Sequence, residues 1–208
     1  MNILNYWQAV VGGNANTNTN AESKNAVGNS EAGVTGMMLG YVVPLSLVTP
    51  AMLSIVVRQY PKLFTDLLPG DRLYIVAFAL FLLQIVAVPL MALIVKHLSE
   101  MVGVIPTYKE AFVVTAVAAT PFWLVSLCYL VPSFAFNIAM HAVAGALAAL
   151  LVYLGIKNVF RLERRGARIM LTIAVVAVAS LAFGVLLIST LMLWGHVQQL
   201  QLAMPASH

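Results

Sequence analysis

Five long apolar runs constrain this chain more than any other feature of its sequence. None of them has Asp, Glu, Lys or Arg in its interior, and they cover residues 36–57, 73–95, 111–131, 134–156 and 169–195. Each is long enough to cross about 30 Å of hydrocarbon as a helix of about 20 residues. The sequence therefore predicts an all-α, polytopic membrane protein with five transmembrane helices.

Composition excludes the soluble alternatives. Hydrophobic residues make up 62% of the 208 residues and charged residues only 9%, with a mean hydropathy of +0.94. Soluble domains carry about 25% charged residues, so this chain has too few to cover a surface that faces water. The net charge of +4 comes from cations beside apolar runs, which favours contact with lipid headgroups over nucleic acid.

The runs divide the chain into three parts. Residues 1–35 are expected to form an N-terminal interfacial segment and a flexible polar linker, 36–195 the five-helix transmembrane domain, and 196–208 a short C-terminal tail. The third and fourth runs are so close that they must form a tight hairpin, and we expect the third to fifth helices to be the packed centre. A four-span alternative would leave one run as a re-entrant element.

Lys and Arg counts predict the orientation. With the N-terminus inside, the inner segments hold eight Lys and Arg residues and the outer segments hold three, Arg58, Lys62 and Arg72. Because cytoplasmic loops carry the excess of positive charge, this favours a cytoplasmic N-terminus and an extracytoplasmic C-terminus.

The most concentrated charge lies between the fourth and fifth runs, at Lys157, Arg161, Arg164, Arg165 and Arg168. If the fourth helix continued past the membrane surface, these residues would make one cationic stripe. Each cation near an anionic leaflet is worth about 1 kcal/mol. The stripe is either a topology determinant that binds anionic headgroups or a docking site for a partner.

The third run holds Thr120, Pro121 and Trp123 in sequence order. Proline in a helix removes one hydrogen bond and favours a kink, here near Val117, that leaves a carbonyl for Thr or a neighbouring helix. The kink is either a hinge or a fixed bend that improves packing.

The fourth run combines small and polar residues. Gly145 and Ala149 form a small-xxx-small pair, which allows another helix to approach closely. Asn137 and His141 lie one turn apart at the start of the run, and Tyr153 lies near its end. Polar groups inside a membrane suggest a functional pocket, while hydrogen bonding to a neighbouring helix is the alternative.

Motifs for enzyme chemistry are missing. The sequence has no His-Glu-x-x-His, Gly-x-Ser-x-Gly, paired-cysteine or Gly-x4-Gly-Lys motif, and its four histidines are too scattered to indicate a metal site. The spans also lack the carboxylate that a proton- or sodium-coupled transporter usually needs. We therefore predict no enzymatic activity, no cofactor and no metal.

Several short segments resemble a known family. They are residues 108–111 (Tyr-Lys-Glu-Ala), 118–124 (Ala-Ala-Thr-Pro-Phe-Trp-Leu), Pro132 and 150–156 (Leu-Leu-Val-Tyr-Leu-Gly-Ile). Together they are similar to the Yip family of Ypt/Rab-interacting membrane proteins, in particular to its bacterial inner-membrane branch. This chain departs from the family pattern after residue 156, where Lys-Asn-Val stands in place of a proline and a later methionine.

The resemblance implies five spans, a cytoplasmic N-terminus and a small periplasmic C-terminus, in agreement with the counts above. We expect a non-enzymatic adaptor or organiser of the cytoplasmic (inner) membrane. Its expected partners are anionic headgroups at the inner face and a membrane protein or a second copy of the chain. The alternative is a small transporter or channel-like protein that uses the third helix and the Asn137/His141 pair.

Overall fold

The computed structural model describes residues 33–60, 70–182 and 184. Within that part every regular element is helical, and five helices are long and apolar enough to span a membrane. The predicted fold class is therefore confirmed. Of the segment 1–35 predicted as interfacial and linker, residues 33–35 instead begin the first helix, whereas residues 1–32 and the predicted tail 196–208 lie outside the described residues.

The first helix runs over Gly33–Gln59 and changes its winding along its length. It contains η1 (Met38–Val42, π-helical), α3 (Val43–Ser46) and α4 (Val48–Gln59). In the π-helical turn the Val43 N–H donates to the Met38 carbonyl five residues back. This turn directly precedes Pro44, which has no N–H to donate.

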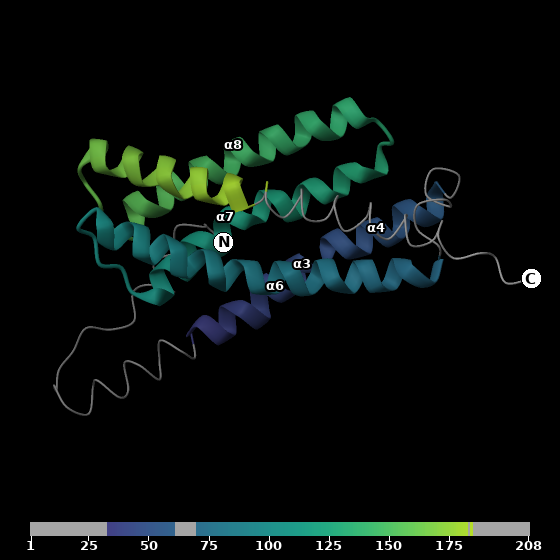
Figure 1. The fold of residues 1–208 in the computed structure, drawn as a ribbon, viewed down its shortest axis with the longest axis horizontal. Helices are drawn as coiled ribbons and strands as arrows, with labels where there is room; N and C mark the ends of the chain where they lie inside the picture. The colour runs from purple at the N-terminus through teal and green to yellow at the C-terminus, as the bar shows by residue number, and fades with distance from the viewer. Residues whose placement is uncertain (1–32, 61–69, 183, 185–208) are drawn as a thin grey trace, which may run out of the picture.

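The remaining helices alternate in direction along an elongated bundle (Figure 1). They are α6 (Gly70–Met101), α7 (Tyr108–Val125) with its 3-10 extension η2 (Ser126–Leu130), α8 (Phe134–Asn158), and a last helix whose described part is Arg165–Ala182. The second helix is longer than its apolar run 73–95, because a helix need not end where it leaves the hydrocarbon. The rest of the predicted run 169–195 is outside the described residues, residue 184 excepted.

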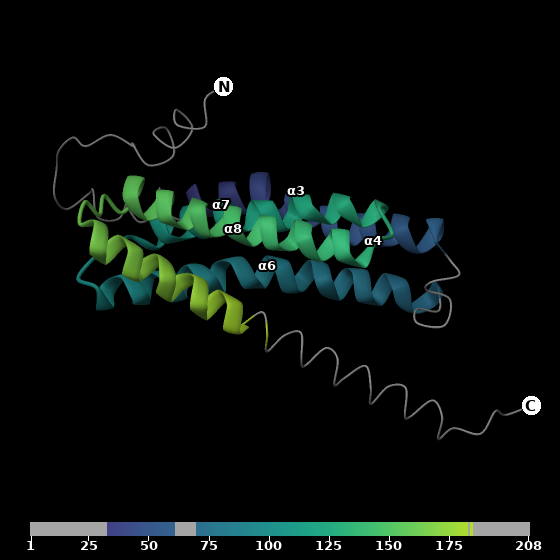
Figure 2. The same cartoon turned by 90° about the horizontal axis from the view of Figure 1, so that it is seen from above.

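The third helix lies at the centre of the bundle. In its most apolar stretch 56% of the residues are buried, against 11–28% in the other four helices. One buried cluster joins it to the first helix and α6, and a second joins it to α6, α8 and the last helix. The expected centre of third to fifth helices was therefore wrong in part, since the first two helices also pack on α7 (Figure 2).

Helices α7 and α8 approach closely at Gly155 of α8. A Cβ added there would lie 2.9 Å from Cγ1 and 3.0 Å from Cγ2 of Val114 on α7. Without a hydrophobic force to drive helices together in lipid, close van der Waals packing at small residues becomes the main attraction. Gly155 therefore sets the spacing between α7 and α8.

Candidate functional site

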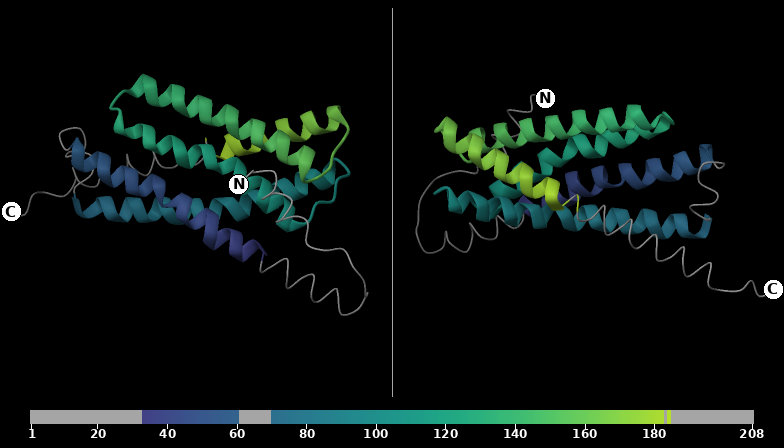
Figure 3. Two further views of the ribbon diagram at one scale, coloured as in Figure 1. Left: turned by 180° about the vertical axis from the view of Figure 1, so that it is seen from behind. Right: turned by 45° about the horizontal axis from the view of Figure 1, so that its top comes forward.

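The ends of four helices meet at one end of the bundle. The end of α6, the start of α7, the end of α8 and the start of the last helix all lie there in both views of Figure 3. Most described cations lie there too: Lys96, Lys109, Lys157, Arg161, Arg164, Arg165 and Arg168. The opposite end holds Arg58 on α4 and Arg72 in the first turn of α6.

The chain breaks sharply after α8. That helix ends at Asn158, the Leu162 N–H donates back to the Ile156 carbonyl at 3.4 Å, and Arg161 has a φ of 53°. The single helical stripe that a continuing fourth helix would make does not form, because α8 ends at Asn158 and the chain turns at Arg161 in a left-handed conformation. Val159 and Phe160 are buried in the core and fix the position of the turn.

The cations of this turn divide into two kinds. Lys157, Arg161, Arg164 and Arg165 are exposed and form no ion pair within the described residues. We call these four residues the exposed basic cluster. They are available to ligands, whereas the fifth predicted cation, Arg168, is only 9% exposed.

Arg168 joins the last helix to α8 through Tyr153. Its Nη2 donates a hydrogen bond of 2.6 Å to the Tyr153 hydroxyl, and its Cζ lies 4.5 Å from the centroid of the same ring. The Nε atom is buried and has no hydrogen-bond partner in the described residues. The structure therefore brings together two residues that the sequence placed in separate groups.

Two of the three described acidic residues at this end are engaged elsewhere. Glu100 contacts Lys96 at 3.8 Å and His97 at 3.2 Å. Glu110 accepts from the Thr107 backbone N–H at 2.8 Å and completes the capping box that begins α7. Glu163 makes no ion pair in the described part of the chain, so the exposed basic cluster keeps its charge.

Thr120 and Trp123 tie α7 to the first helix. The Thr120 hydroxyl is 2.7 Å from that of Tyr41, and the Tyr41 and Trp123 rings meet edge to face at 6.5 Å. A second hydroxyl pair, Thr49 with Ser126, lies further along at 2.8 Å. Neither pairing could be predicted from the sequence, because both link positions more than 70 residues apart.

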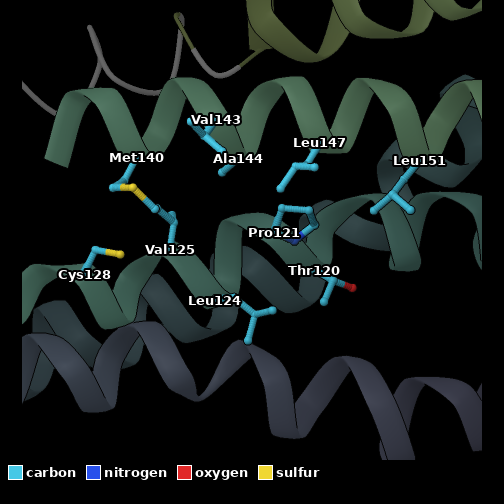
Figure 4. Close-up of a pocket in the computed structure, with 10 residues that line it drawn as sticks. All are labelled: Thr120, Pro121, Leu124, Val125, Cys128, Met140, Val143, Ala144, Leu147 and Leu151. Atoms are coloured by element: carbon cyan, nitrogen blue, oxygen red, sulfur yellow. The ribbon is translucent and has the colours of Figure 1, made fainter. Parts of the chain in front are cut away.

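Pro121 lies within α7 and lines an apolar cleft of about 340 Å³ between α7 and α8 (Figure 4). Met140, Ala144 and Leu147 of α8 face it across the cleft, with Cys128 at one end. Because no charged side chain lines it, the cleft offers no group to hold an ion.

Asn137 and His141 make hydrogen bonds within the hairpin. The Asn137 amide donates to the carbonyls of Val131 and Ser133, both at 3.0 Å. His141 Nδ1 donates to the Asn137 carbonyl at 2.8 Å, so in the neutral ring Nε2 accepts from the Tyr129 hydroxyl at 3.0 Å. The Tyr129 and His141 rings stack at 5.6 Å, and these bonds hold the turn together.

Gly145 does not lie where α8 meets α7. A Cβ added at Gly145 has no neighbour within 4 Å, whereas Ala144, Ala148 and Val152 are buried. The buried small face is thus one residue removed from the predicted Gly145/Ala149 pair. Gly145 is half-buried with open space beside it, and Gly155 is the glycine that the sequence pattern missed.

The fold and the basic end define a multi-pass helical membrane protein. In the described residues no group of His, Cys, Asp and Glu is arranged to hold a metal ion. Comparison with family models matches residues 18–187 to the Yip1 domain, so the chain belongs to the Yip1-domain family; the resemblance to the family is confirmed, and its bacterial branch stays a prediction. No curated protein and no solved structure matches the chain.

Proposed function

We propose that this protein is a non-enzymatic adaptor or organiser of a bacterial cytoplasmic membrane, acting through the exposed basic cluster. The observation that carries the proposal is the gathering of four exposed, unpaired cations beside a rigid turn. Buried Val159 and Phe160 hold that turn against the core. Positions fixed in this way suit recognition of a partner better than cations on a loose loop do.

The orientation is part of the proposal. Seven described cations lie at the end that holds the exposed basic cluster, against Arg58 and Arg72 at the other. The positive-inside rule then puts the basic end in the cytoplasm, with the N-terminus inside and the C-terminus outside. At that face the cluster meets the anionic headgroups, each cation contributing about 1 kcal/mol.

A second surface supports association with another helix. Half-buried Gly145 has open space beside it, and Ala142 and Ala146 next to it are exposed, so this side of α8 leaves room for a close neighbour, because small residues allow helix backbones to approach closely in lipid. We infer that a membrane protein, or a second copy of this chain, packs there while the basic cluster contacts the headgroups.

Charge reversal of three arginines tests the adaptor role. Arg161→Glu, Arg164→Glu and Arg165→Glu are combined in a tagged copy at native expression, which is extracted in mild detergent and examined by mass spectrometry for bound proteins. We expect a stoichiometric partner in the native protein and its loss in the variant. Arg58→Glu at the opposite end is the control, and reporter fusions check that the topology is unchanged.

The same partner at the same stoichiometry in both proteins would contradict the proposal. A partner-free oligomer would point instead to the transporter alternative, to be examined by flux assays in liposomes. The structure gives that alternative little support, because Asn137 and His141 hold the hairpin turn and the cleft beside Pro121 is apolar.

A further inference from the structure

The start of the last helix carries an unusual charge. The Arg168 N–H donates to the Arg164 carbonyl at 3.0 Å, so Arg164, Arg165 and Arg168 all belong to the first turn. The amides at this end have no acceptor within the helix, and the helix dipole makes the end positive. Three arginines therefore add positive charge where a helix favours an anion.

Nothing in the described residues compensates this charge. The start of α7 shows the ordinary solution, since Thr107 and Glu110 cap it reciprocally. No carboxylate makes a hydrogen bond or ion pair with the first turn of the last helix in the part of the chain that the structure describes. Glu163, which precedes Arg164, makes no ion pair either, so no described carboxylate neutralises this turn by direct contact.

Arg168 points to the same conclusion independently. Its side chain is nine-tenths buried, Tyr153 takes one of its five N–H donors, and the buried Nε donor has no partner in the described residues. A buried charge is costly unless it is paired. Arg168 directly follows residues 165–167 in the helix, so this unpaired donor belongs to the same end of the helix as the free amides.

The approach to this turn is open. A Cβ added at Gly166 would have no neighbour within 4 Å, and Arg164 and Arg165 on either side of the helix start are exposed. Because Gly166 has no side chain and open space lies beside it, a ligand can reach the backbone amides of residues 165–167 there.

We propose that the first turn of the last helix, with Arg168 at its base, is a binding site for a phosphate group. Backbone amides at a helix start bind phosphate oxygens, and a guanidinium matches them with two parallel donors. The phosphate belongs either to an anionic phospholipid at this face or to free phosphate. The inference rests on the proposed function only in placing this end of the bundle at headgroup level.

Native mass spectrometry of the full chain in a neutral maltoside tests the site. Phosphatidylglycerol and phosphatidylcholine are added separately at equal mole ratio, and the retained lipid is measured for the native protein, Arg168→Gln and Arg161→Gln. Arg161→Gln removes the same charge from the exposed basic cluster outside the first turn. In a second arm, thermal unfolding is followed in inorganic phosphate and in chloride of equal ionic strength.

We expect selective retention of phosphatidylglycerol, weakened at least about thirtyfold by Arg168→Gln and only about fivefold by Arg161→Gln, which loses a single exposed headgroup contact. Stabilisation of the native protein by inorganic phosphate, without a preference between the lipids, would assign the site to free phosphate. Equal losses in the two variants, or no response to phospholipid or phosphate, would overturn the proposal.

Two further variants keep the test valid if Arg168→Gln does not fold. Arg168→Lys keeps the charge but loses the paired donors, and Tyr153→Phe removes the hydroxyl that positions the guanidinium. Both should weaken retention of phosphatidylglycerol if the site is real, whereas a purely structural Arg168 would change stability alone. The lipid assay contains no partner protein, so loss of the phosphate site would leave the adaptor role standing. Failure to find a protein partner would likewise leave the phosphate site standing.

Discussion

Alanine at Gly155 and alanine at Gly145 should have different effects on stability, although both glycines lie inside α8. At Gly155 the new Cβ would lie 2.9 Å from Val114 Cγ1, and Val114 is 1% exposed and stiff at χ1. At Gly145 the new Cβ meets nothing within 4 Å. Overpacking of a core costs about 1–3 kcal/mol, so Gly155→Ala should be less stable than Gly145→Ala by that amount.

Comparing the two variants cancels the gain in helix propensity of about 1 kcal/mol that alanine brings at either site. Unfolding is measured by circular dichroism during titration of SDS into mixed micelles. Val114→Ala removes the crowded methyl groups, so combining it with Gly155→Ala should reveal a favourable coupling of at least about 0.5 kcal/mol. Equal stabilities of the two glycine variants would refute the close approach of α7 and α8.

Three other contacts give measurable expectations. A double-mutant cycle of Tyr41→Phe and Thr120→Ala should show a coupling of about 0.6 kcal/mol in the SDS titration, typical of hydrogen bonds between membrane helices; zero coupling would contradict it. Gly145→Leu should change the oligomer size in light scattering but not the unfolding midpoint, because the side chain enters open space; an unchanged size would remove this side of α8 as an interface. His141→Phe should destabilise the protein by about 1 kcal/mol through the lost bond to Tyr129, and Tyr129→Phe should add little to it.

Helix number and type could be predicted from the sequence because lipid requires every backbone group to be satisfied within a helix. The number of sufficiently long apolar runs therefore predicts the number of membrane-spanning helices. The helix ends were less predictable, since α6 continues past its apolar run through Lys96 and Glu100. The break after α8 was missed because Arg161 adopts a positive φ, which is uncommon for residues other than glycine.

Which face of α8 is buried could not be predicted, because this helix is apolar almost all round. A soluble helix marks its buried face by the contrast of apolar and polar residues, and a membrane helix surrounded by lipid has no such contrast. Small residues occur on both sides of α8, at Gly145 and Ala149 as well as at Ala144 and Ala148. The fit of Gly155 against Val114, together with the burial of Val152 and Ile156 among α7 side chains, shows which side faces α7.

The contrast between two helix starts links this fold to its proposed chemistry. The start of α7 follows the local rules, with Thr107 and Glu110 satisfying the free amides. The start of the last helix breaks them, with arginines at the positive end of a dipole and Arg168 buried beside Tyr153. Local rules that agree elsewhere in a chain and fail at one place indicate that the failure serves something other than stability. A phosphate group resolves the conflict at the last helix, because it supplies the negative charge that the dipole and the arginines both favour.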